Sequence, residues 1–341
     1  DEVVAVASER PVLQTTFAVD ASDICELAPG RALMVNAAGD LNFEQIIEPA
    51  KYQACSFERI YFSRGNDFDI HRERKLLGFQ LRDAILKSID GDIEHSVFSY
   101  IPNTAEVAYH GMMDGIRQHC VDIGKPLSLV RSEKVVWKDI KLRTFITEGT
   151  SRNNLAAHVY DITFGTVQPG VDNLIVIDDS IVRGTTLRES IIQILDRLHP
   201  RKIVIVSSAP QIRYPDFYGI DMSRIGEFIA FQAAVALIEE RGMHSLLDEV
   251  YEECKIQSQG NPVRRIYEPF TADELNLKMV ELLQPATVQT PIELVFQSLE
   301  GLHEAIPNHP GDWYFSGKYP TPGGERLCRI SYTQWYEARK N

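Results

Sequence analysis

The chain has 341 residues, of which 44% are apolar and 24% charged, a balance typical of globular proteins. Its net charge of -13 excludes broad nucleic-acid binding, which needs a basic surface, but not a local basic pocket for a small anion. The 5 cysteines form no Cys-x-x-Cys pair, which argues against a disulfide framework or zinc module and favours a reducing cytoplasm. The longest strongly apolar run, residues 228–238, is too short to span a membrane, so we expect no membrane partner.

The order of predicted elements indicates an α/β fold. Residues 1–40 are expected to form short strands and turns, including a strand at 31–36 after the Pro29-Gly30 turn. The pattern then predicts helices at 72–88, 106–122 and 185–198 and strands at 96–101, 126–130, 174–177 and 202–207. Repeated strand–helix–strand order implies a mainly parallel sheet flanked by helices, in which ligands bind beyond the carboxyl ends of the strands. The last hundred residues are expected to be helical and irregular.

The strand at 174–177 leads into two adjacent acids, Asp178 and Asp179. Two carboxylates at a strand end cost free energy unless hydrogen bonds or positive charge meet them. A sugar diol and a hydrated Mg²⁺ both satisfy that requirement. An ordinary strand and turn with exposed acids is the alternative.

The turn after the acids is rich in small and hydroxyl residues. Its backbone N–H groups and hydroxyls, at the positive end of a following helix, make a cradle for an anion. Gly184 permits a tight turn and close backbone approach. Carboxylates for a ribose beside a cradle for a phosphate predict a site for a phosphorylated sugar.

The run from Val176 to Thr186 resembles the signature with which type I phosphoribosyltransferases bind 5-phosphoribosyl 1-pyrophosphate (PRPP). The resemblance implies catalytic, PRPP-binding and metal-binding roles for Asp178 and Asp179. It implies that the PRPP-binding residues also include Ser180, Ile181, Val182, Arg183, Gly184, Thr185 and Thr186.

Further segments resemble one family with this fold, the amidophosphoribosyltransferases, which begin purine synthesis. These segments are residues 55–64, 143–146, 218–222 and 317–321. The resemblance implies that residues 1–45 are the end of an Ntn-type glutaminase domain, 46–240 the phosphoribosyltransferase domain and 241–341 a helical or irregular extension. The glutaminase nucleophile of the family is an N-terminal cysteine, whereas this chain starts with Asp1 and has little of that domain. We therefore expect no glutamine hydrolysis by this chain, and ammonia that is free or comes from a missing glutaminase segment.

The resemblance also implies residues that bind the leaving pyrophosphate. It places a loop at residues 101–105, with Asn103 and Thr104 contacting PRPP and Thr104 near the metal. The family usually has an acid at the position of Asn103, and a helix-capping role for either residue is the alternative. Arg143 is expected to be catalytic because its forked donors suit pyrophosphate, and Arg131 to bind PRPP. A solvated surface arginine is the alternative for Arg143. A loop at 131–155, to which Arg152 is assigned, is expected to close over the site.

Some family members hold a 4Fe–4S cluster with four cysteines. Cys55 stands at one ligand position, but Asp216, Gly311 and Tyr314 stand at the others. One thiolate cannot hold such a cluster, so we expect Mg²⁺ but no iron–sulfur cofactor.

The predicted reaction is transfer of ammonia to PRPP, which gives 5-phosphoribosylamine and pyrophosphate. The alternatives are a phosphoribosyltransferase with a nucleobase acceptor and a non-catalytic PRPP or nucleotide regulator. The altered segment at 131–142 leaves the regulator open. The family resemblance further implies a homo-oligomer, a dimer or a tetramer.

Overall fold

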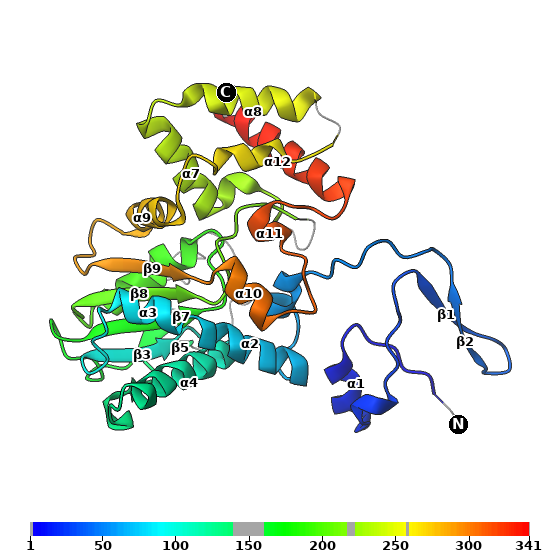
Figure 1. Cartoon of the computed structure of the whole chain (residues 1–341), viewed down its shortest axis with the longest axis horizontal. Helices are drawn as coiled ribbons and strands as arrows, with labels where there is room; N and C mark the ends of the chain where they lie inside the picture. The colour runs from blue at the N-terminus through cyan, green and yellow to red at the C-terminus, as the bar shows by residue number, and fades with distance from the viewer. Residues whose placement is uncertain (1–2, 139–159, 217–221, 257–258, 341) are drawn as a thin grey trace, which may run out of the picture.

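The computed structural model describes residues 3–138, 160–216, 222–256 and 259–340. Its centre is a parallel sheet of five strands in the order β4-β3-β7-β8-β9. The strands are β3 (Ser96–Tyr100), β4 (Arg131–Ser132), β7 (Asn173–Asp178), β8 (Lys202–Ser207) and β9 (Ile292–Phe296). Figure 1 shows β7 within this sheet. Asp178 is the last residue of β7, the central strand, so it lies at the carboxyl edge of the sheet.

Both faces of the sheet are covered by helices because its strands are apolar on both sides. Ile175 and Ile177 of β7 pack into a cluster with residues of α3 (Arg82–Ser88) and α4 (Glu106–Asp122), beside α2 (Phe68–Gln80). Leu174 and Val176 point the other way, into the larger core. That core includes η4 (Leu187–Ile191), α6 (Ile192–Asp196), α7 (Ile229–Glu240) and α9 (Ala272–Leu283).

A helical layer lies beyond the sheet (Figure 1). Tyr332 of α12 donates its hydroxyl to Leu247 O of α8, which fixes the two helices together. The elements of this region are α8 (His244–Ile256), α11 (Trp313–Ser316), α12 (Pro322–Lys340), η6 (Ile225–Glu227) and η7 (Pro262–Ile266), whereas α10 (Leu299–Ala305) lies beside α2.

The first fifty residues lie beside this body (Figure 1). They contain α1 (Arg10–Phe17), η1 (Ala21–Asp23) and an exposed antiparallel hairpin of β1 (Arg31–Val35) and β2 (Leu41–Gln45). Arg10 joins α1 to the start of α2 through Asp67 at 2.7 Å and Asp69 at 2.9 Å. The remaining elements are η2 (Glu58–Phe62), η3 (Leu127–Leu129) and a ribbon of β5 (Val136–Lys138) with β6 (Tyr160–Ile162).

The structure confirms the predicted parallel α/β fold but corrects several elements. Residues 126–130 are not a strand: they form the 3-10 turn η3, and the short edge strand β4 begins at Arg131. The predicted helix at 72–88 is two helices, which meet at Leu81. The short helix α1 was not expected, and neither was β9, which adds a fifth strand from the C-terminal part. No helix in the described ranges is long and apolar enough to cross a membrane.

Candidate active site

Asp178 and Asp179 lie where β7 ends and the chain leaves the sheet. Their backbone is fixed by the next strand, because Ser208 N donates to Asp178 O at 3.0 Å and Ala209 N to Asp179 O at 3.1 Å. Asp179 N also donates to the Asp178 carboxylate at 2.9 Å. The two carboxylates are therefore held by the rigid edge of the sheet rather than by a free loop.

The electrostatics of this pair favour a bound cation or diol. Burial, and next the charge of Asp179, raise the pKa of Asp178 well above its usual value. Burial also raises the pKa of Asp179, against which hydrogen bonds from the Ser180 and Thr104 side chains favour the ionised form. A hydroxyl-bearing or positively charged ligand would relieve the cost of two adjacent half-buried carboxylates.

The loop at residues 101–105 lies against the same pair. Ile101 N donates to Ile177 O at 2.9 Å, and the peptide bond between Pro102 and Asn103 is cis. Thr104 donates its hydroxyl to Asp179, whereas Asn103 is exposed. The alternative that either residue caps α4 is wrong, because the N-cap is Ala105 and no side-chain cap bond forms. The structure thus brings Thr104 to Asp179, as the predicted loop requires.

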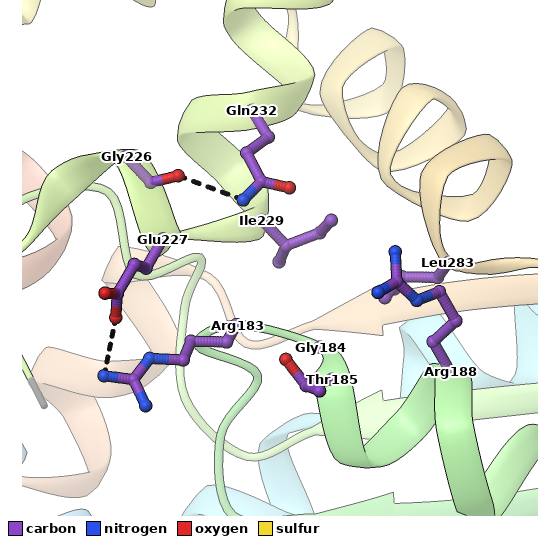
Figure 2. Close-up of a pocket in the computed structure, with 9 residues that line it drawn as sticks. All are labelled: Arg183, Gly184, Thr185, Arg188, Gly226, Glu227, Ile229, Gln232 and Leu283. Carbon is purple, nitrogen blue, oxygen red and sulfur yellow. Dashed lines mark hydrogen bonds and ion pairs between the residues drawn. The ribbon is translucent and has the colours of Figure 1, made fainter. Parts of the chain in front are cut away.

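The turn after Asp179 borders a cavity of about 390 Å³ (Figure 2). Gly184 has φ of 71°, a conformation that favours glycine. The floor is partly apolar, from Ile229 and Leu283. The remaining lining residues are Arg183, Thr185, Arg188, Gly226, Glu227 and Gln232.

Two contacts connect this turn to η6 and α7. Arg183 forms an ion pair with Glu227 at 2.7 Å, and Ile229 N donates to Val182 O at 2.9 Å. Figure 2 shows Arg183 reaching toward Glu227, with Arg188 on the opposite side of the cavity. Arg188 was not among the predicted site residues, although it lies one helical turn after Gly184, where its side chain can return to the turn.

Arg131 is not brought to this site. It is opposite Val97 near the start of β3, roughly 13 Å along the strands from the level of Asp178. Its guanidinium binds buried Asp172 at 2.7 Å and Thr166 O at 2.8 Å. Arg143 and Arg152 lie outside the described residues, as does most of the predicted closing loop.

The four positions that the resemblance assigns to iron–sulfur ligands lie near one another but do not carry four thiols. Cys55 forms a backbone bridge with Gly311, and Asp216 accepts a hydrogen bond from Trp313, the residue before Tyr314. Burial raises the pKa of Cys55 to about 12, which disfavours the thiolate that metal binding needs. These residues do not fit a four-cysteine cluster.

The parallel sheet and the helices on both of its faces have the arrangement of the type I phosphoribosyltransferase fold. Comparison with solved structures supports this fold. The glutamine PRPP amidotransferase of B. subtilis, complexed with ADP and GMP, aligns with a TM-score of 0.57 and 24% identity over 87% of this chain and 53% of that one. A structure described as the allosteric regulatory enzyme of purine biosynthesis aligns with a TM-score of 0.57 over 90% and 55%.

Sequence comparison supports the predicted resemblance to the amidophosphoribosyltransferases. The amidophosphoribosyltransferase of Pseudomonas aeruginosa is 31% identical over 212 residues, 61% of this chain and 39% of the relative. The Escherichia coli and Bacillus subtilis amidophosphoribosyltransferases are each 29% identical, over 66% and 65% of the chain. No family model matches the chain. The predicted resemblance to amidophosphoribosyltransferases is confirmed, and the chain spans 39% to 43% of the length of these relatives.

Proposed function

We propose that the chain transfers ammonia to PRPP, which gives 5-phosphoribosylamine and pyrophosphate. The observation that carries this proposal is the half-buried Asp178–Asp179 pair at the end of β7, followed directly by the Gly184 turn. The relatives named amidophosphoribosyltransferase support it independently.

Each part of PRPP has a place in this arrangement. Asp178 and Asp179 accept hydrogen bonds from the ribose hydroxyls, and the backbone N–H groups of residues 180–186 bind the 5-phosphate. Thr104 contacts the pyrophosphate side, together with Asn103. Arg143, outside the described residues, is proposed from the resemblance alone to bind the departing pyrophosphate.

Mg²⁺ fits the oxygen donors of this site. Two carboxylates and the Thr104 hydroxyl are hard ligands of the kind that Mg²⁺ prefers, and substrate oxygens would complete its shell. No larger metal-binding group of His, Cys, Asp and Glu occurs among the described residues. Bound Mg²⁺ would supply positive charge that neutralises pyrophosphate.

The reaction needs charge stabilisation more than a strong base. The ammonia lone pair forms the N–C1 bond while the C1–O bond to pyrophosphate breaks, and the new ammonium group loses a proton to solvent. Positive charge grows on the ribose in the transition state, where the carboxylates of Asp178 and Asp179 stabilise it. The rigid backbone around both residues keeps them in position for this role.

Two further parts of the proposal concern the source of ammonia and the assembly of the protein. Ammonia is free in solution or comes from a glutaminase segment that these residues do not contain. By resemblance, we further propose a cytoplasmic homo-oligomer.

The double variant Asp178→Asn/Asp179→Asn tests the proposal. We expect it to lose ammonia-dependent pyrophosphate release by about a hundredfold or more, because both charges next to the ribose are removed. The control is Asp122→Asn, an exposed carboxylate at the far end of α4, which should retain full activity. Full activity in the double variant would overturn the assignment.

A further inference from the structure

A buried serine of the C-terminal helix α12 holds the backbone of η6. Ser331 is 6% exposed, and its hydroxyl accepts a hydrogen bond from Ile225 N at 2.9 Å. The same hydroxyl donates to Ser223 O at 2.8 Å. One side chain therefore satisfies a backbone donor and a backbone acceptor at the start of η6, and a buried backbone group without a partner is costly.

Aromatic packing holds η6 and the start of α7 against the same helix. A Cβ on Gly226 would lie 2.4 Å from Trp335 Cδ1, so the backbone of η6 is in close contact with this indole ring. The Trp335 ring also packs edge-to-face against Phe231 of α7, with the ring centroids 4.7 Å apart. Since protein interiors are close-packed, η6 cannot shift toward α12 without displacing this ring.

On their other side, η6 and α7 contact the turn at residues 180–186. Ile229 N, at the first residue of α7, donates to Val182 O at 2.9 Å. Ile229 Cγ1 also lies 3.7 Å from the position of a Cβ on Gly184. Figure 2 shows Gly226 and Ile229 across the cavity from Gly184. A continuous series of contacts thus leads from Ser331 through η6 and Ile229 to the backbone of the turn.

We propose that Ser331 is a positioning residue for the 5-phosphate of PRPP. From α12 it holds η6, and through Ile229 it keeps the turn in the shape that presents its backbone N–H groups to the phosphate. Ser331 is not among the described residues that line the cavity, so it acts through the backbone that it holds. Its effect on substrate binding rests on the proposed function, whereas its mechanical link to the turn does not.

The first arm of the test compares Ser331→Ala with Tyr332→Phe in ammonia-dependent pyrophosphate release. Each variant removes one buried hydroxyl of α12, but that of Tyr332 donates to Leu247 O of α8. Both variants also carry Glu227→Gln, so that a change in the ion pair with Arg183 does not mask the effect on the turn.

Ser331→Ala should raise the KM for PRPP by about fivefold, the order expected from the loss of one hydrogen bond. The kcat at saturating PRPP should be unchanged, because the 5-phosphate is bound alike in the ground state and the transition state. Tyr332→Phe should leave both constants unchanged. The same KM in both variants would overturn the positioning role.

The second arm does not depend on activity. Amide hydrogen exchange is measured at Ile229 and Arg188, whose backbone N–H groups donate to carbonyls of the turn. Ser331→Ala should accelerate exchange at both amides by about fivefold, and Tyr332→Phe at neither. Unchanged exchange in Ser331→Ala would overturn the inference. Accelerated exchange, together with an unaltered protein that releases no pyrophosphate, would overturn only the proposed function.

A second variant keeps the test decisive if Ser331→Ala does not fold. Gly226→Ala displaces η6 through the contact of its methyl group with Trp335 and leaves the hydrogen bonds of Ser331 intact. It should raise the KM for PRPP and accelerate exchange at the same two amides. An unaltered KM and unaltered exchange in Gly226→Ala would overturn the link between η6 and the turn.

Discussion

Asp178 and Asp179 lower the stability of the ligand-free fold, and this effect indicates that they bind a ligand. Asp178 follows five consecutive buried residues of β7, and Asp179 follows it directly. Burial raises the pKa of both carboxyls, and the charge of Asp179 raises that of Asp178 further. A ligand that binds these carboxylates would offset the free-energy cost of burying them, so their position indicates a binding site.

The cost makes stability depend on pH. Because the pKa of Asp178 is raised on folding, the folded state binds its proton more tightly than the unfolded chain, whose carboxyl titrates near 3.8. The free energy of unfolding therefore falls as pH rises from 3.8 through the raised pKa. Asp178→Asn should stabilise the ligand-free protein above this window but not below it, as measured by urea unfolding across pH. A gain that does not vary with pH would contradict this account.

Gly184 provides a second residue-scale prediction. A methyl group there is disfavoured by φ of 71° and would lie 2.3 Å from Leu283 Cδ2. Gly184→Ala should lower the free energy of unfolding by more than the ~1–2 kcal/mol of left-handed backbone alone, and should weaken PRPP binding. Gly170→Ala is the matched control, since φ is 70° and nothing lies within 4 Å of the added Cβ. If Gly184→Ala and Gly170→Ala had equal effects on the free energy of unfolding and on PRPP binding, Gly184 would have no special role in the site.

At the scale of elements, the sequence predicted those parts of the site whose residues are contiguous in the chain. The β7 strand, its two acids and the Gly184 turn are contiguous, so their order alone predicts a phosphorylated-sugar site. Arg131 was misleading because strand register, not sequence order, places it at the opposite end of β3. The cavity walls from α7 and α9 could not be predicted, because Gln232 and Leu283 approach Gly184 only through tertiary packing. Strand β9 (Ile292–Phe296) was not predicted because it is only partly buried and Glu293 interrupts its apolar run, unlike the fully buried β3.

The position of Arg131 predicts a change in stability without a change in substrate binding. Arg131→Met would leave Asp172, which is fully buried, without its charged partner. We expect a loss of about 2 kcal/mol in the free energy of unfolding and an unchanged KM for PRPP. Denaturant unfolding and steady-state kinetics measure the two quantities. A raised KM at unchanged stability would instead support direct contact with PRPP.

The ion pair between Glu227 of η6 and Arg183 of the turn predicts that removing the Glu227 charge raises the affinity for PRPP. Glu227 competes with any phosphate for the guanidinium of Arg183, with which it pairs at 2.7 Å. Glu227→Gln should therefore tighten the binding of PRPP, measured by calorimetry as a lower Kd. Glu239→Gln, at the far end of α7 and paired with Arg339, should leave the Kd unchanged. Weaker binding by Glu227→Gln would show that the ion pair organises the site instead of competing with the ligand.

At the scale of the whole molecule, segments far apart in the sequence build and surround one central sheet. The C-terminal part supplies β9 and the Leu283 wall, and residues 3–50 contact the body through Arg10. The sheet and site thus form from segments spread along most of the chain. The matched region covers 39% and 42% of the length of the Pseudomonas aeruginosa and Escherichia coli relatives.

Pyrophosphate release from PRPP and Mg²⁺, with ammonium chloride or glutamine as the nitrogen source, tests the central claim most directly. The account predicts release with ammonium and none with glutamine. No release with ammonium would contradict it. Release with a nucleobase instead would identify a different transferase, and PRPP binding without any release would identify a non-catalytic regulator.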